Sequence, residues 1–242
     1  AEDVLFALRN SFLAEKPSRK VSPIEPNRSL VPNESQVFFL QKEMAQAQVR
    51  IEFSTGLYDE KKAPAGQLFN EYFGGGMAGL VFQELREARA LAYSAWAHYF
   101  NPARPNEENI LVGAIGCQAD KTLDAVEAFM ELLEKMPINE TRWQSAHSSI
   151  VSSYRTNPIG YRSTPSFVYD VRALGLKGDP RRNRYEILRL AEIDLLKEFY
   201  EREIQAKSKL LSIVGDSAKI NLADLSSFGP VTKVDAEQLF TR

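Results

Sequence analysis

Few residues of this 242-residue chain could carry out chemistry, and the histidines come first. His98 and His147 stand 49 positions apart, and neither has a second histidine at the spacing of H-x-x-E-H or H-E-x-x-H, the motifs of zinc peptidases. Cys117 is the only cysteine, which excludes a disulfide framework and a multi-cysteine metal site. We therefore interpret both histidines as ordinary surface or core residues. We expect no metal site, no bound cofactor and no catalytic residue in this chain alone.

Nucleophile and phosphate motifs are also missing from the sequence. No serine stands in a G-x-S-x-G elbow, and Cys117 ends an apolar run, so we expect a buried thiol. Counting residues does not exclude a Ser-His-Asp triad, and a self-sufficient serine or cysteine enzyme stays as a third hypothesis. The glycine run 74–76 leads into an expected helix, but it lacks the lysine and hydroxyl residue of a phosphate-binding loop.

One segment has a more specific pattern. Residues 72–94 contain a glycine run, a methionine, Leu-Arg-Glu and Leu-Ala-Tyr-Ser at fixed spacing. This segment resembles a signature of the insulinase, pitrilysin and mitochondrial processing peptidase family of zinc metallopeptidases. The segments 42–46, 192–200 and 211–216 are similar to the family's opening strand, closing helix and last strand, so the resemblance covers roughly residues 35–216.

The resemblance implies both a fold and a partner. Members of that family pair two α+β halves, and this chain resembles the C-terminal, inactive half of the LuxS/processing-peptidase-like metallohydrolase fold. The resemblance implies that zinc is held by a separate H-x-x-E-H domain, in the same polypeptide or in a partner subunit. It also implies a peptide substrate, and it allows a dimer.

The family's substrate-contacting positions fall on Arg86 and Tyr93, and the glycines that line its cleft fall on Gly74, Gly75 and Gly76. An arginine can donate two hydrogen bonds to a carbonyl or carboxylate, and a tyrosine hydroxyl can stabilise an oxyanion. The alternative is structural: Arg86 pairs with a nearby glutamate, Tyr93 packs in the sheet, and the glycines stop a helix.

The sequence also departs from the family pattern. Ala78, Gly79 and Leu80 stand where the family commonly has Ser-Ser-Arg, so substrate handling is expected to differ or weaken. Ala90 stands where a glycine usually precedes Leu-Ala-Tyr, which puts a glycine-type helix cap in doubt.

Hydrophobic patterning predicts the elements that position these residues. Strands are expected at 36–41, 47–55, 91–100, 109–118, 210–214 and 231–234. Helices are expected at 3–15, 61–73, 77–89, 120–135, 165–174 and 192–204, and another from the N-cap Asn139 to about Thr156. Paired strands with helices in blocks predict an α+β fold with an antiparallel sheet covered by helices. The basic stretch 181–184 is interpreted as a solvated loop, with a partner-docking patch as the alternative.

Composition and prolines set the remaining limits. The net charge of -2 gives no field to collect nucleic acid or anionic membrane, and no apolar run approaches the ~20 residues that cross a bilayer. Four prolines between 17 and 32 predict an extended connector. We expect a helix and connector at 1–34 and the α+β domain at 35–242. The chain begins at Ala1, so we expect a processed form or a piece of a longer chain, and the compartment stays open.

Two hypotheses of function follow. The first is the substrate-binding half of a zinc metalloendopeptidase, which closes over a peptide together with the H-x-x-E-H domain. The second is a catalytically inert scaffold or assembly domain of the same fold. Intact Arg86 and Tyr93 favour the first, and the residues at 78–80 favour the second.

Overall fold

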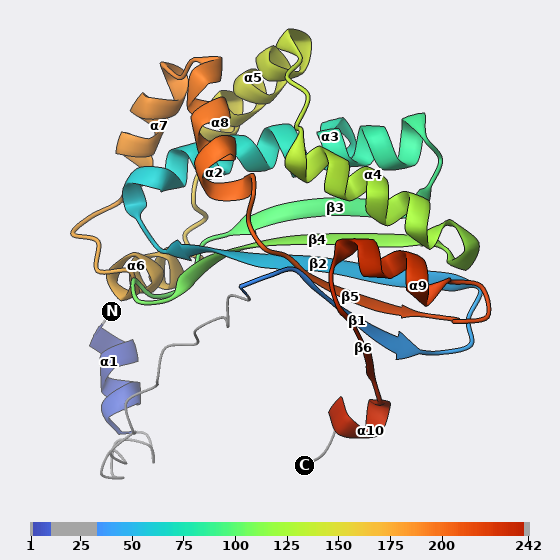
Figure 1. Ribbon diagram of the computed structural model, residues 1–242. Helices are drawn as coiled ribbons and strands as arrows, with labels where there is room; N and C mark the ends of the chain where they lie inside the picture. The colour runs from blue at the N-terminus through green and yellow to red at the C-terminus, as the bar shows by residue number, and fades with distance from the viewer. Residues whose placement is uncertain (1, 11–32, 240–242) are drawn as a thin grey trace.

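A six-stranded sheet forms the centre of the protein (Figure 1). The computed structural model describes residues 2–10 and 33–239. The strands run in the order β3-β4-β2-β5-β1-β6 across the sheet. Their bounds are β1 (Gln36–Gln41), β2 (Gln46–Leu57), β3 (Ala92–Phe100), β4 (Glu108–Gln118), β5 (Leu210–Gly215) and β6 (Val231–Val234). All six strands predicted from the sequence are present.

The helical segments are of three kinds: α-helices, shorter 3-10 turns and wider π-helical turns. The α-helices are α1 (Glu2–Arg9), α2 (Ala63–Phe69), α3 (Leu80–Phe82), α4 (Thr122–Glu134), α5 (Glu140–Thr156), α6 (Thr164–Ala173), α7 (Arg181–Arg189), α8 (Ile193–Phe199), α9 (Leu222–Leu225) and α10 (Ala236–Leu239). The π-helical segments are η2 (Asn70–Gly74), η4 (Gln83–Ala88) and η6 (Tyr200–Ile204). Short 3-10 turns are η1 (Glu60–Lys62), η3 (Gly76–Ala78), η5 (Ala119–Lys121) and η7 (Ser226–Phe228). None of the helices in the described ranges has the length and apolar character to cross a membrane.

The sheet is mixed, and this is where it differs from the prediction. β2 pairs antiparallel with β4 and β5, and β3 pairs antiparallel with β4, as expected. However, β1 pairs parallel with both β5 and β6. The cause is a long-range insertion, because β5 returns after the whole helical block and enters the sheet between β1 and β2. Local patterning could not predict that pairing, whereas the α+β class with helices covering the sheet is confirmed.

Burial alternates along the strands and separates two faces of the sheet. In β2, Val49, Ile51 and Phe53 are buried, while Gln48 and Arg50 are exposed. The buried side chains pack under α2, α4 and α8, which lie on one face of the sheet (Figure 1). Most residues on the other face are partly or fully exposed, although Val112 of β4 and Ser54 of β2 are buried there. This open face carries the candidate surface described below.

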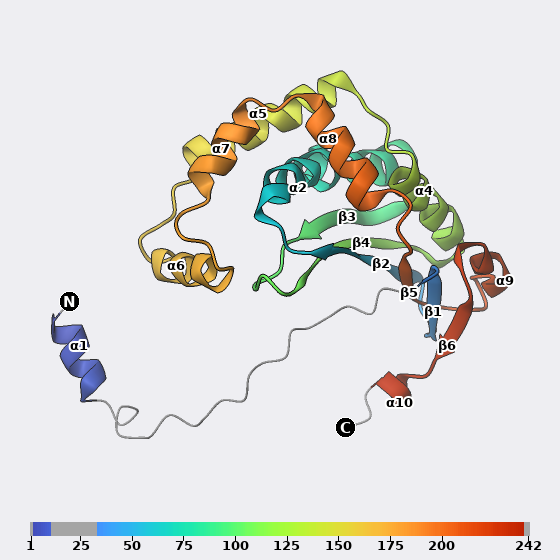
Figure 2. The ribbon, with the colours of Figure 1, turned by 60° about the vertical axis from the view of Figure 1, so that its left-hand side comes forward.

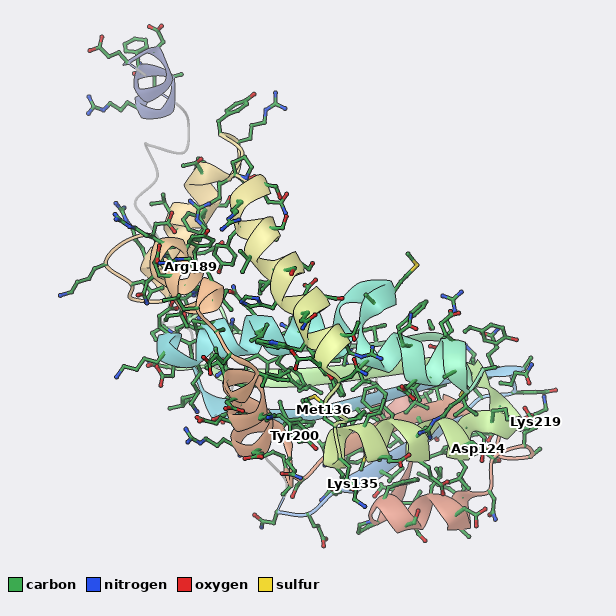
Figure 3. All side chains as sticks on the ribbon, turned by 90° about the horizontal axis from the view of Figure 1, so that it is seen from above. Asp124, Lys135, Met136, Arg189, Tyr200 and Lys219 are labelled. Carbon is green, nitrogen blue, oxygen red and sulfur yellow. The ribbon has the colours of Figure 1, made fainter. Side chains whose placement is uncertain are left out.

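The end of α4 is fastened to the helix that precedes β5. The Tyr200 hydroxyl accepts a hydrogen bond from the Met136 backbone N–H at 3.0 Å and donates to the Leu133 carbonyl at 3.2 Å. Figure 3 shows Met136 and Tyr200 close together where α4 ends. Just beyond, the Asn139 side chain accepts from the Arg142 N–H, which confirms the predicted N-cap of α5.

The basic stretch after Asp179 is a helix, so the interpretation as a solvated loop is wrong. α7 begins at Arg181, where the Asp179 carboxylate accepts from the backbone N–H, and it buries Leu188. The sequence did not predict this helix, because only one strongly apolar residue, Leu188, faces the core and no apolar periodicity results. Arginine is nevertheless a good helix former, which is consistent with the helix observed. α7 lies beside α5, and together with α6 these helices form a lobe at one end of the sheet (Figure 2).

The N-terminal predictions are only partly tested. α1 (Glu2–Arg9) confirms a helix near Asp3. The rest of that helix and the proline connector lie outside the described residues, and the boundary between residues 34 and 35 stays a prediction.

Candidate functional site

Arg86 lies in the π-helical segment η4 and is accessible. Its side chain is 47% exposed, and its Nε lies 3.6 Å from the Glu87 carboxylate. The guanidinium carbon lies 4.8 Å from the centre of the Phe82 ring. Both contacts are surface contacts of modest strength, so the guanidinium keeps donors free for another molecule.

Tyr93 lies at an irregularity in β3. The pairing of β3 with β4 shifts between Ala92 and Ser94, which makes Tyr93 the extra residue of a bulge. Its side chain is 54% exposed, and in the described part of the chain its hydroxyl has no hydrogen-bond partner. Tyr93 is therefore accessible rather than packed inside the sheet, whereas the Arg86–Glu87 contact is the one that the structural alternative expected. The roles of both residues stay predictions.

A tight connection links the two residues along the backbone. The Leu91 N–H donates to the Leu85 carbonyl at 2.9 Å, which fastens the end of η4 to the start of β3. Arg86 follows Leu85 directly, and Tyr93 comes two residues after Leu91. Within the described residues no hydrogen bond or cation–π contact joins the guanidinium to the phenol. The structure therefore brings their backbones to one corner and leaves both side chains exposed there.

The structure explains why glycine stands at each position of the run 74–76. A Cβ at Gly74 would stand 1.8 Å from the Ala97 carbonyl oxygen of β3, and one at Gly75 would stand 2.2 Å from the Glu71 carbonyl oxygen. Gly76 has φ of 60°, the left-handed region that glycine favours. The run therefore lies against β3, and only Gly76 faces open space.

Asn70 fixes this segment to the strand. Its side-chain amide donates to the Tyr99 carbonyl at 2.9 Å and accepts from the Tyr99 N–H at 2.6 Å. Such pairing satisfies both backbone groups that Tyr99 turns toward the segment. The glycine run is thereby held beside the strand that carries Tyr93.

The departures from the family pattern have distinct environments. Leu80 is 1% exposed and belongs to the core, so the family's arginine position is an apolar packing position here. A Cβ at Gly79 would meet the Gly75 nitrogen at 2.5 Å, which leaves no room for a serine side chain. Ala90 keeps a left-handed φ of 49°, so the cap conformation persists without glycine.

Sequence analysis missed an exposed aromatic row beside Tyr93. Trp96 is 42% exposed and Phe100 45% exposed, and His98 lies between them on the same face of β3. Ala114 is the register partner of both Trp96 and Arg50, so the Arg50–Glu52 ion pair continues this face on β2. We call Trp96, His98, Phe100, Arg50 and Glu52 the open-face surface. The sequence could have predicted this surface, because the rings of Trp96, His98 and Phe100 stand at every second position of the strand.

The histidines lie on separate elements. His98 contacts Asn70 at 3.3 Å and the Phe100 ring at 4.5 Å, and desolvation lowers the pKa of its imidazole. His147 lies in α5, where its Nε2 is 2.8 Å from the Leu188 carbonyl oxygen. Among residues 2–10 and 33–239, no group of three or more histidine, cysteine, aspartate or glutamate side chains is placed to hold a metal ion.

Cys117 is fully buried, as the apolar run predicted. Burial raises the pKa of its thiol, which disfavours the reactive thiolate.

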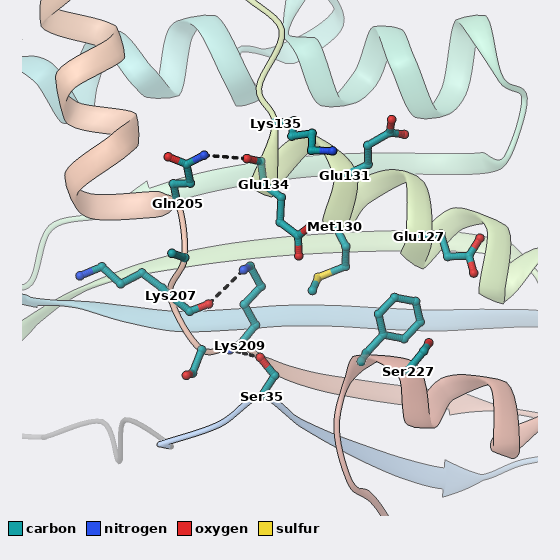
Figure 4. Close-up of a pocket in the computed structure, with 13 residues that line it drawn as sticks. Ser35, Glu127, Met130, Glu131, Glu134, Lys135, Gln205, Lys207, Lys209 and Ser227 are labelled. Atoms are coloured by element: carbon teal, nitrogen blue, oxygen red, sulfur yellow. Dashed lines mark hydrogen bonds between the residues drawn. The ribbon is translucent and has the colours of Figure 1, made fainter.

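Several hollows lie away from Arg86 and Tyr93. One of about 820 Å³ lies between α4 and the chain that enters β5 (Figure 4). Lys209 points into it, is only 3% exposed, and donates to the Lys207 carbonyl at 2.9 Å. The second hollow, about 680 Å³, lies between α5, α6 and α7 and is lined by arginines.

These features define the protein's class: an α+β domain with one helix-covered and one open sheet face. The chain belongs to the peptidase M16 inactive domain family, whose family model matches residues 1–144. That match includes the segment 72–94 and confirms the resemblance on which the expectations rested. No curated protein sequence matches the chain.

Solved structures share the fold at low sequence identity. A peptidase M16 inactive domain from Pseudomonas fluorescens superimposes with a TM-score of 0.68 at 14% identity, covering 81% of this chain and 46% of that one. A conserved protein from Enterococcus faecalis gives 0.69 at 14% identity, covering 89% and 49%. A protease from Helicobacter pylori gives 0.69 at 12% identity, covering 88% and 52%. The chain thus spans about half the length of these relatives.

Proposed function

We propose that this chain is the substrate-binding, non-catalytic half of a zinc metalloendopeptidase. It would close over an unfolded peptide together with a separate H-x-x-E-H domain, which would supply the metal chemistry. The observation that carries the proposal is the exposed Tyr93 at the β3 bulge, whose hydroxyl has no partner in the described residues, together with the exposed guanidinium of Arg86 seven positions earlier. Membership of an inactive peptidase domain family supports the same role.

The two side chains have complementary roles in this proposal. Arg86 would hold a peptide carbonyl or carboxylate through two parallel hydrogen bonds. The Tyr93 hydroxyl would donate to the scissile carbonyl oxygen as negative charge develops on it. The open-face surface would offer aromatic rings to the rest of an extended peptide, since such rings bury large areas at little entropic cost.

The second candidate is a catalytically inert scaffold domain of the same fold. Leu80 favours it, because this position is buried in the core rather than turned toward substrate. The close approach of Gly79 to Gly75 favours it too, because polar side chains are absent from the turn.

A reconstitution assay separates the two candidates. The chain is mixed with a zinc-bearing half that carries H-x-x-E-H, and cleavage of a quenched fluorescent peptide is followed with and without chelator. We expect cleavage only with both halves and metal present, and a loss of at least about tenfold in kcat/KM for Arg86→Ala. Arg202→Ala is the matched control, because Arg202 pairs with Glu198 on the surface at 3.5 Å.

The outcomes are distinct. Stable association of the halves without any cleavage would favour the scaffold. Cleavage that is equally fast with Arg86→Ala would remove the role assigned to that guanidinium.

A further inference from the structure

We propose that the hollow between α5, α6 and α7 binds an acidic stretch of peptide. This inference rests on the proposed function as a peptide-binding half and deepens it. The volume of about 680 Å³ lies within the range of about 300–1,000 Å³ typical of ligand sites. We call this hollow the arginine pocket, after the residues that line it: Arg155, Arg181, Arg182 and Arg184.

The positive charge is concentrated locally. Only one carboxylate, Asp179, lines the pocket against the four guanidiniums, while the whole chain has a net charge of -2. A positively charged pocket in a molecule with a small negative net charge attracts anions to the pocket rather than to the whole surface.

Two of the arginines are anchored within the protein. Arg184 donates to the Glu60 carboxylate through Nε at 2.7 Å and Nη2 at 2.5 Å. Arg181 donates to Asp179 through Nε at 3.0 Å and lies 4.8 Å over the Phe167 ring. These contacts hold the pocket wall in place, and they already engage Nε and Nη2 of both groups.

The other two arginines have donors to offer. Arg155 uses Nε on the Tyr185 hydroxyl at 2.8 Å, which orients the group and leaves its two terminal nitrogens without a partner in the described residues. Arg182 is exposed, and its side chain forms no hydrogen bond or ion pair within the described part of the chain. Both guanidiniums line the same pocket, so a ligand with two or more carboxylates would engage both.

The shape and the walls favour a peptide over a single small anion. The volume exceeds what one phosphate or carboxylate would fill, and Phe167 and Tyr185 add aromatic walls. Aspartate and glutamate side chains supply carboxylates for the guanidiniums, and their aliphatic parts pack on rings.

Binding of labelled peptides to the full 242-residue chain tests this assignment directly. Fluorescence anisotropy compares a fluorescein-labelled peptide rich in glutamate with the same peptide in which glutamine replaces every glutamate, at low ionic strength. Arg155→Gln together with Arg182→Gln should raise the Kd of the acidic peptide by about tenfold or more. Circular dichroism confirms that the double variant is folded.

Arg189→Gln is the matched control. Arg189 lies at the end of α7 (Figure 3), pairs with Glu186 at 2.6 Å and does not line the pocket, so its substitution should change the Kd by less than about twofold. Equal binding by the double variant would overturn the proposal. Equal binding of the glutamine peptide would also overturn it, as would binding of tripolyphosphate at these arginines without any binding of the acidic peptide.

The readout needs no zinc-bearing half. Peptide binding with failed reconstitution would therefore count against the proposed function alone. Reconstitution without acidic-peptide binding would count against the arginine pocket alone.

Discussion

At the scale of single residues, positions within one sequence signature differ in how far they are exposed to solvent. Arg86 and Tyr93 match the family signature and are exposed, whereas Leu80, in the same signature, belongs to the core. Residue type and spacing located all three, but the bulge that turns Tyr93 outward depends on the register of β3 against β4. That register is a tertiary property, so it could not be predicted from the segment itself.

Some residue-scale expectations needed only local information. The Asn139 cap and the burial of Cys117 were predicted correctly because capping and apolar runs are local signals. The position of Arg184 was missed because its partner Glu60 stands 124 residues away in the sequence.

Lys209 carries a prediction about pH. Burial lowers the pKa of its ammonium below the ordinary 10.5, so the native state releases the proton more easily than the unfolded chain. Between the lowered pKa and about 10.5 the unfolded state binds more protons, and the free energy of unfolding therefore rises with pH. Urea unfolding should show wild type gaining stability relative to Lys209→Met as the pH rises from neutral toward 10.5.

Lys233→Met serves as the control, because it removes an exposed lysine on β6 by the same change of side chain. A stability difference between wild type and Lys209→Met that stays constant with pH would show that Lys209 is not desolvated.

At the scale of elements, three helices predicted to be regular are interrupted by π-helical turns. Segments predicted as continuous helices at 61–73, 77–89 and 192–204 contain the π-helical turns η2, η4 and η6. Their periodicity is close enough to a regular helix that sequence patterns do not distinguish the two. At η4 the wider turn precedes the connection to β3 and carries Arg86, so the break contributes to the site.

The pair Glu60–Arg184 joins η1 to α7 and gives a prediction for that contact. Burial raises the pKa of the Glu60 carboxyl, but hydrogen bonds from Arg184 and Tyr58 outweigh it and hold the pKa below the usual 4.5. A lowered native pKa stabilises the fold above the unfolded pKa, and this contribution is lost as the pH falls through the native value.

Glu60→Gln should therefore destabilise the protein by about 2 kcal/mol at neutral pH, as measured by urea unfolding. The difference from wild type should shrink as the pH falls below 4.5. Glu186→Gln, which removes an exposed pair with Arg189 on the same helix, should have little effect. A difference for Glu60→Gln that does not vary with pH would contradict this account.

At the scale of the whole molecule, the fold leaves one sheet face open. The element types and the α+β class followed from sequence patterns, but the insertion of β5 between β1 and β2 did not. Which face stays open follows from the alternation in each strand once the pairing is known. The chain also spans about half the length of its structural relatives.

The most direct measurement of the central claim is kcat for Tyr93→Phe in the reconstituted two-half enzyme. Loss of a donor to the developing oxyanion should lower kcat by about 100-fold, with equal assembly of the halves. Tyr169→Phe, which changes another exposed tyrosine on α6, should retain wild-type activity. A Tyr93→Phe enzyme as fast as wild type would contradict the claim that this hydroxyl serves the reaction.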